Sequence, residues 1–233
     1  MTRGLAIVGH GKMGRLIEQL APEYGFDVRL TLKSATNAHG VGLTSENLRG
    51  VDAAMEFSAP SAAIQNIRQL ATLGIPVVAG TTGWFQQLPC VREAVESSGG
   101  ALVWSPNFSV GIYRFRQIIA QAASAFAAEA EYEAWGWEIH HSAKRDAPSG
   151  TLLAVAEEMK QAGFDRAINL SATRAGAHPG THEIGFDSSS DTITIRHTAR
   201  SREGFARGAL RAARWIVGKN GVFEFREIVN ELD

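Results

Sequence analysis

The sequence has little cysteine, no long apolar run and no excess of either charge. Its 233 residues include one cysteine, Cys90, so no disulfide can form within the chain, which is typical of a reducing compartment. No stretch approaches the roughly 20 apolar residues that span a bilayer, and the short apolar run near the N-terminus is too short for a secretory signal. The net charge of −1 creates no field that would attract nucleic acid or an anionic membrane. We therefore expect a cytoplasmic globular protein that binds neither.

Short apolar runs alternate with helical patterns over the first hundred residues. Strands are predicted at residues 5–8, 28–32, 53–57, 77–79 and 101–104. Between some of them, apolar residues recur at helical spacing, and two of these patterns end at Pro22 and Gly74. Because strands that alternate with helices form β-α-β units, this part of the chain predicts a Rossmann-type α/β domain with a parallel sheet.

The pattern changes after Pro106. Strands now follow one another in quick succession, which favours a second, smaller α+β domain. Helices are predicted at 112–126, 150–162 and 203–217, and strands at 135–141, 168–174, 182–187 and 192–198.

A glycine-rich turn follows the first predicted strand. The segment Gly9-His10-Gly11-Lys12-Met13-Gly14 matches the G-x-G-x-x-G pattern and lies between a strand and a helix, as dinucleotide binding requires. The first glycine permits a tight turn, the second lets the backbone approach a pyrophosphate, and the third lets helix and strand pack closely. The N–H groups at the helix start favour the negative charge. A plain glycine-rich turn is the alternative, and we favour dinucleotide binding.

The end of the second strand bears on which dinucleotide is bound. Sites selective for NAD usually place an acid there, bonded to the ribose 2′-hydroxyl. Here Lys33 and Ser34 follow the strand, and the next acid is Glu46. A cation and a hydroxyl suit a 2′-phosphate, so we expect NADPH to be preferred over NADH, although Lys33 as a solvated loop residue is the alternative.

The segment Glu138–Thr151 contains the most informative motif of the chain. Two histidines, His140 and His141, end a predicted strand, Lys144 follows, and a Pro-Ser-Gly-Thr turn opens a helix at Gly150 and Thr151. The N–H groups of that helix start favour an anion, Lys144 adds positive charge, and either histidine can exchange a proton near neutral pH. The motif predicts a small anionic substrate that needs a proton, rather than two strand-end histidines beside a capped helix.

No metal site is predicted in this motif. Adjacent histidines on a strand point to opposite faces, so His140 and His141 would not bind one ion together. No cysteine or carboxylate cluster in the sequence supports zinc.

These segments resemble the 4-hydroxy-tetrahydrodipicolinate reductase (dihydrodipicolinate reductase) family. The match covers nearly the whole chain, and the His-His-x-x-Lys-x-Asp-Ala-Pro-Ser-Gly-Thr segment is its most specific part. The matching segments are Gly80–Gly83, Pro106–Gly111, Glu138–Thr151, Arg174–Gly176, Gly180–His182 and Phe205–Ala209. The chain departs from the family in its six-residue glycine turn, in Lys33 where an acid is common, and in Thr181 within the Gly-Glu-His segment.

The resemblance implies a fold and an assembly. It implies a dinucleotide-binding domain of residues 1–106 and 205–233, and a substrate-binding domain of residues 107–204 with a mixed four-stranded sheet. A homotetramer would assemble through that second sheet.

The resemblance also implies an activity, the NADPH- or NADH-dependent reduction of 4-hydroxy-tetrahydrodipicolinate in the diaminopimelate route of lysine biosynthesis. His140 is then the general acid or base and Lys144 the second proton donor. The substrate carboxylates would be held by His141, Gly150 and Thr151. The nicotinamide would meet Gly80, Thr81 and Thr82, and the inter-domain hinge at Ser105, Pro106, Asn107 and Phe108 would complete the cofactor pocket.

Two other functions remain as alternatives. A regulator that binds NADP without catalysis would keep the glycine turn but have no need for His140 and Lys144. Another two-domain dehydrogenase, acting for example on an amino-acid semialdehyde, would be expected to lack the His-His-x-x-Lys segment.

Overall fold

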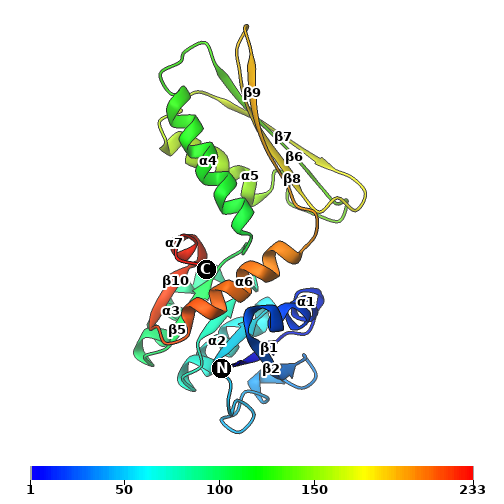
Figure 1. The fold of residues 1–233 in the computed structure, drawn as a ribbon, viewed down its shortest axis with the longest axis vertical. Coiled ribbons are helices and arrows are strands. Elements are labelled where there is room, and N and C mark those ends of the chain that lie inside the picture. Colours follow the sequence, from blue (N-terminus) through cyan, green and yellow to red (C-terminus); the bar gives the residue numbers. More distant parts are fainter. Residues whose placement is uncertain (1, 233) are drawn as a thin grey trace. The chain divides into compact units, whose positions relative to one another are not determined.

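The computed structural model describes residues 2–232. Residues 1 and 233, at the two ends of the predicted dinucleotide-binding domain, lie outside the described residues. The described chain forms two units: residues 2–109 with 203–232, and residues 110–202 (Figure 1). Among residues 2–232, no helix has both the length and the apolar character needed to cross a membrane.

The first unit contains a six-stranded parallel sheet. Its strands lie in the order β10-β5-β4-β3-β1-β2. The five strands predicted from apolar runs are confirmed, and β10 was not predicted. The bounds are Arg3–Val8 for β1, Phe26–Leu32 for β2, Ala53–Glu56 for β3, Val77–Ala79 for β4, Ala101–Trp104 for β5 and Gly221–Glu224 for β10.

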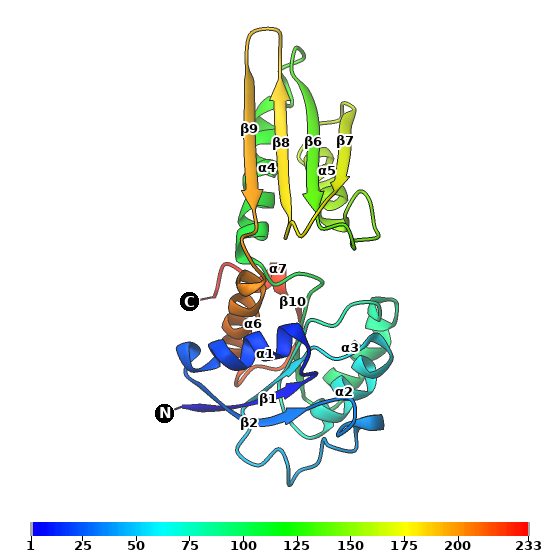
Figure 2. The ribbon, with the colours of Figure 1, turned by 90° about the vertical axis from the view of Figure 1, so that its right-hand side faces the viewer.

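Helices cover both faces of this sheet. In Figure 2, α1 and α6 lie on one side, and α2 and α3 lie on the other. Both faces of the central strands are therefore buried, which explains why these strands are continuous apolar runs rather than alternating ones. The helices are α1 (Lys12–Leu20), α2 (Pro60–Thr72), α3 (Leu88–Ser97), α6 (Glu203–Ile216) and α7 (Phe225–Ile228), with short 3-10 helices η1 (Ala21–Tyr24), η2 (Ala38–Gly40) and η3 (Phe85–Gln87).

The second unit contains a mixed four-stranded sheet in the order β7-β6-β8-β9 (Figure 2). β6 pairs with β7 in parallel and with β8 antiparallel, and β8 pairs with β9 antiparallel, which confirms the expected mixed sheet. The elements are β6 (Glu133–His140), β7 (Ile168–Arg174), β8 (Thr181–Asp187), β9 (Thr192–Thr198), α4 (Val110–Phe126) and α5 (Gly150–Gln161). β6 begins two residues earlier than predicted and ends one residue earlier, so His141 lies outside it.

The two helices α4 and α5 pack on one face of this sheet (Figure 1). Because side chains alternate along a strand, Glu138 and His140 of β6 lie on the helix-covered face. Trp135, Trp137 and Ile139 lie on the opposite face, which no helix of the described residues covers. We call that surface the open sheet face.

Candidate functional site

The cofactor residues predicted in the first unit share one edge of its sheet. Each follows the carboxyl end of a parallel strand, and β1 lies between β2 and β3, so the strand order reverses there and creates a ligand-binding crevice. Backbone hydrogen bonds join these strand ends: Gly9 N to Leu32 O (2.9 Å), Phe57 N to Val8 O (2.8 Å), Gly80 N to Glu56 O (2.9 Å) and Ser105 N to Ala79 O (3.2 Å).

The three glycines of the turn have three different physical roles. Gly9 has φ +101°, and a Cβ there would lie 2.2 Å from the Phe57 carbonyl oxygen. A Cβ on Gly14 would lie 2.1 Å from the Gly9 carbonyl oxygen, so this glycine lets α1 pack against the strand end. A Cβ on Gly11 would meet nothing within 4 Å. Packing within the chain therefore does not require glycine at position 11, whereas a backbone that must approach a pyrophosphate does.

The start of α1 suits an anion. Gly11 is its N-cap residue and provides no side-chain hydrogen bond to the first N–H groups. Lys12 is exposed and Met13 is half-buried. The His10 ring is turned to the side of α1, where its Nε2 lies 2.7 Å from Glu18 Oε2.

A pocket of about 320 Å³ lies beside this turn and includes Gly9, Lys33 and Ser34. Both Lys33 and Ser34 are exposed at its rim. Asn37 and Asn66 are buried and joined by a 3.0 Å hydrogen bond from Asn37 Nδ2 to Asn66 Oδ1. The pocket thus combines a cation, hydroxyl and amide groups next to the glycine turn, a donor set that fits the adenosine half of a dinucleotide.

Sequence reasoning missed Glu56, the last residue of β3. Its carboxylate is wholly buried and accepts hydrogen bonds at Oε1 from the Ser58 backbone N (3.3 Å) and Asn66 Nδ2 (3.2 Å), as well as from the Ser58 hydroxyl. Burial raises the pKa of Glu56, and these hydrogen bonds oppose the rise only in part. An acid at the end of an otherwise apolar strand was the signal in the sequence.

The residues expected at the nicotinamide follow β4. Gly80 packs against the Phe57 ring, where a Cβ would lie 2.1 Å from Cε1. Thr81 is buried, and its carbonyl oxygen accepts a 2.8 Å hydrogen bond from Trp84 Nε1. Thr82 is exposed.

The segment after β5 forms a compact turn within the first unit. Ser105 is wholly buried, its hydroxyl donates to the Asn107 carbonyl oxygen (2.5 Å), and Asn107 Oδ1 accepts from Ser109 N (2.8 Å). Pro106 is exposed, and the buried Phe108 ring packs edge-on against Phe225 with centroids 4.8 Å apart.

In the second unit, the buried carboxylate of Glu138 organises the motif. Its Oε1 accepts hydrogen bonds from Arg174 Nη2 (2.7 Å) and Ser149 N (2.8 Å), and its Oε2 accepts from the Ser149 hydroxyl. Two imidazoles lie at the same Oε2: His182 Nε2 at 3.3 Å and His140 Nδ1 at 3.7 Å. Burial acts to raise the pKa of Glu138, but the bonds from Ser149 and Arg174 outweigh it, so the pKa is lowered and the carboxylate stays charged.

The two buried histidines are driven toward the neutral form. Burial lowers the pKa of His140, with the charges of Lys144 and Arg174 acting in the same direction and that of Glu138 opposing them. Burial and the neighbouring His140 lower the pKa of His182 to about 4. The two rings meet edge-on with centroids 5.0 Å apart.

Lys144 lies in the loop between β6 and α5. Its Nζ is held by both carboxylate oxygens of Asp146, at 2.8 and 2.9 Å. This pairing is the largest cause of the lowered pKa of Asp146. Arg174 also binds this loop, because its Nη2 donates to the Asp146 carbonyl oxygen.

Gly150 and Thr151 form the start of α5, as predicted. Ser149 is the N-cap residue, and its Oγ accepts a 3.2 Å hydrogen bond from Leu152 N. Because Ser149 also binds Glu138, the helix start is fixed next to His140. His141 is half-buried in the loop, where its carbonyl oxygen accepts from Lys144 N at 3.0 Å.

The fold brings Glu138, His140 and His182 together, a grouping that the sequence did not show. One potential ligand atom from each lies within 4.8 Å of the others. The set is nevertheless a poor cation site, since Arg174 and Ser149 already occupy the Glu138 oxygens and the Arg174 guanidinium is a fixed positive charge beside them.

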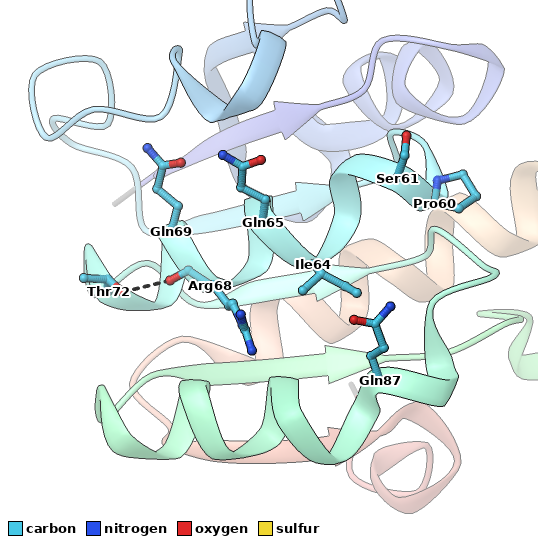
Figure 3. Close-up of a pocket in the computed structure, with 8 residues that line it drawn as sticks. All are labelled: Pro60, Ser61, Ile64, Gln65, Arg68, Gln69, Thr72 and Gln87. Atoms are coloured by element: carbon cyan, nitrogen blue, oxygen red, sulfur yellow. Dashed lines mark hydrogen bonds between the residues drawn. The ribbon is translucent and has the colours of Figure 1, made fainter.

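A larger hollow of about 600 Å³ lies on the outer side of α2 (Figure 3); none of the predicted site residues line it, although Ser61 and Gln65 also line the pocket beside the glycine turn. It is an open groove whose side chains are mainly uncharged and polar, so it brings together no set of groups suited to hydride or proton transfer. Its lining comprises Pro60, Ser61, Ile64, Gln65, Arg68, Gln69, Thr72 and Gln87.

Comparisons with known proteins agree along the whole chain. Two family models match, described as dihydrodipicolinate reductase N-terminus over residues 4–108 and C-terminus over residues 111–229. A 4-hydroxy-tetrahydrodipicolinate reductase of Christiangramia forsetii is 33% identical over 239 residues, covering 98% of both chains. One of Archaeoglobus fulgidus is 34% identical over 245 residues, covering 91% of this chain and 94% of the relative. The fold is shared with a dipicolinate-bound dihydrodipicolinate reductase from Paenisporosarcina sp. TG-14, with a TM-score of 0.80, 19% identity and coverage of 100% of both chains.

Proposed function

The chain belongs to the dihydrodipicolinate reductase family, and we propose that it reduces 4-hydroxy-tetrahydrodipicolinate to tetrahydrodipicolinate with NADPH. The reaction is a step of the diaminopimelate route of lysine biosynthesis. The proposal includes a cytoplasmic location, the reducing compartment that a single cysteine indicates.

In this reaction the substrate loses water, hydride attacks the conjugated imine, and a proton completes the addition. Bound NADPH supplies the hydride. His140 donates this proton, and the ammonium of Lys144 is the second group able to supply it. The N–H groups of Gly150 and Thr151, together with His141, hold the substrate carboxylates.

One cluster of contacts carries the proposal. His140 Nδ1 lies 3.7 Å from the buried carboxylate of Glu138, and the charge of Lys144 acts on the same ring. Ser149 binds Glu138 and thereby holds the start of α5 at this strand end. A proton donor, a cation and a helix N-terminus thus meet at one place, and this combination suits an anionic substrate that must be protonated.

The preference for NADPH rests on Lys33 and Ser34. Both are exposed at the rim of the pocket next to the glycine turn, and the first residues after β2 include no carboxylate that would bond to a ribose 2′-hydroxyl. A 2′-phosphate placed there gains a charged hydrogen bond from Lys33.

The open sheet face supports a homotetramer assembled through the second unit. Trp135, Trp137 and Ile139 are each half-buried on this face, and the Trp135 ring covers Gly185 of the next strand. Indole rings on an uncovered sheet face are typical of a surface that a partner buries. A second copy of the chain is the partner that the proposal names.

The two alternatives are not favoured. A regulator without catalysis does not require a histidine placed beside a buried carboxylate, as His140 is beside Glu138. Another two-domain dehydrogenase does not account for family models and relatives that match along the whole chain.

The test of this function is NADPH oxidation, followed by absorbance, with substrate freshly made by the preceding synthase. His140→Gln and Lys144→Ala should each lower kcat strongly, by about 10²- to 10⁴-fold for His140, while NADPH affinity stays unchanged in titration calorimetry. Near-normal kcat in both variants would mean that the proton comes from another group. No turnover by the wild-type chain would exclude the function.

A further inference from the structure

The carboxylate of Glu138 binds more groups than a structural ion pair requires. It is wholly buried, its oxygens accept hydrogen bonds from Arg174 of β7 and from Ser149 at the start of α5, and Oε2 lies 3.3 Å from His182 Nε2 of β8. Glu138 and His182 are directly opposite each other in the antiparallel pair, and both face the helix-covered side of the sheet.

The two nitrogens of His140 have different surroundings. Nδ1 is buried, has no hydrogen-bond partner and lies 3.7 Å from Glu138 Oε2. The Nε2–Cδ2 edge faces the bare α-carbon of Gly180, where a Cβ would lie 3.0 Å from both atoms. A side chain at position 180 would therefore crowd Nε2, and glycine avoids this contact.

We propose that Glu138 is a positioning residue that keeps the Nδ1 proton of His140 directed into the protein, so that Nε2 is the atom that exchanges a proton with the substrate. The inference rests on the proposed function only for the identity of that substrate. Oε2 lies slightly beyond hydrogen-bond distance from Nδ1, and such contacts tighten when substrate binds. Through Ser149, the same carboxylate fixes the start of α5 relative to His140.

The charges around His140 show how Glu138 affects the protonation of this ring. Arg174 of β7 and Lys144 of the loop disfavour a protonated ring, whereas Glu138 favours it. His182 of β8 adds no charge near neutral pH, since its pKa is about 4. Glu138 of β6 and, after it, Asp146 of the loop are thus the carboxylates that stabilise the imidazolium form from which a proton is given.

The first test needs no variant. Nitrogen-15 NMR of the histidine rings reports which nitrogen carries the proton, and loss of one signal set in His140→Gln assigns this ring among the 7 histidines. In wild type, neutral His140 should be the Nδ1–H form. An Nε2–H form in wild type would overturn the proposal.

The second test removes the charge and keeps the shape. In Glu138→Gln, the His140 signals should shift toward the Nε2–H form and the pKa of His140 should fall. The limb in which kcat declines with rising pH should then move to lower pH, and kcat should drop about 100-fold, as expected for a misdirected group. Glu138→Asp should restore part of the activity and of the Nδ1–H form, which a merely structural role would not do. Unchanged signals and pH profile in folded Glu138→Gln would refute the role.

A matched control is Glu158→Gln. Glu158 is also an ion-paired carboxylate of the second unit, bound by Arg116 Nε at 3.0 Å, but it lies on α5 away from His140. The His140 signals should not change in this variant. Because the NMR measurement needs no turnover, the Nδ1–H form in a chain without reductase activity would refute the proposed function alone. Turnover with an Nε2–H His140 would refute the positioning role alone.

Discussion

At the scale of single residues, the proposed preference for NADPH depends on Lys33. A charged hydrogen bond to a 2′-phosphate contributes about 1.5–3 kcal/mol, or roughly 10- to 150-fold in affinity. We predict that Lys33→Asp erases or reverses the preference for NADPH over NADH, because an acid repels the phosphate and bonds to a free 2′-hydroxyl. The measurement is kcat/KM for each cofactor at saturating substrate.

Lys160→Asp, an exposed lysine of α5, provides the same change of charge in the second unit and should leave the ratio unaltered. Equal or better use of NADH by the wild-type chain would show that Lys33 is an ordinary solvated loop residue.

Residues of a linear motif could be predicted from the sequence, whereas contacts between distant strands could not. His140, Lys144 and Gly150 were found because a linear motif contains them. His182 and Glu138 are 44 positions apart, and their cross-strand pairing depends on the register of β6 and β8, which no local pattern specifies. Glu138 opens the same linear motif, but no local pattern showed that its carboxylate would be buried beside both His140 and His182.

At the scale of elements, two substitutions in the glycine turn should have different effects, one on stability and the other on NADPH binding. Gly14→Ala should destabilise the protein by about 1–3 kcal/mol, since its Cβ would lie 2.1 Å from the Gly9 carbonyl oxygen and push α1 off the strand end. Gly11→Leu should leave the free energy of unfolding nearly unchanged, because a Cβ there meets nothing within 4 Å. It should instead weaken NADPH binding more than tenfold, since its side chain enters the pyrophosphate position.

Urea unfolding and calorimetric titration of NADPH separate the two effects. Each variant is the control for the other. Full NADPH affinity in Gly11→Leu would rule out this turn as the cofactor site.

Apolar runs and periodicity predicted most elements of both units but missed α3 and β10. The ten-residue α3 buries only Val91 and Val95, so it provides a single i, i+4 pair rather than a repeating stripe. The four-residue β10 is an edge strand that buries Val222 and pairs with β5, more than a hundred residues earlier in the chain. Elements such as α3 and β10 form because the rest of the sheet is there to pack against or pair with. Their own sequences therefore contain little periodicity from which they could be predicted.

At the scale of the whole molecule, the open sheet face bears on assembly. The half-exposed indole rings on this sheet cost free energy in water, and a second copy of the same face removes them from it. Charged side chains of this face are paired with opposite charges, since Arg196 Nε of β9 donates a hydrogen bond to Glu183 of β8. A surface that combines indole rings with paired charges suits a symmetric contact better than an unspecific one.

We therefore predict that Trp137→Arg dissociates the proposed homotetramer. Each interface would gain unpaired positive charges where two sheets meet, and a desolvated charge without a partner costs several kcal/mol. Light scattering after size exclusion should give about four times 25.1 kDa for the wild type and a smaller mass for the variant. Ile118→Arg is the control, because Ile118 is 50% exposed on α4, away from the open sheet face, and receives the same charge. If Trp137→Arg keeps the wild-type mass while remaining folded, the open sheet face is not the interface. A wild-type mass of one chain would exclude the tetramer itself.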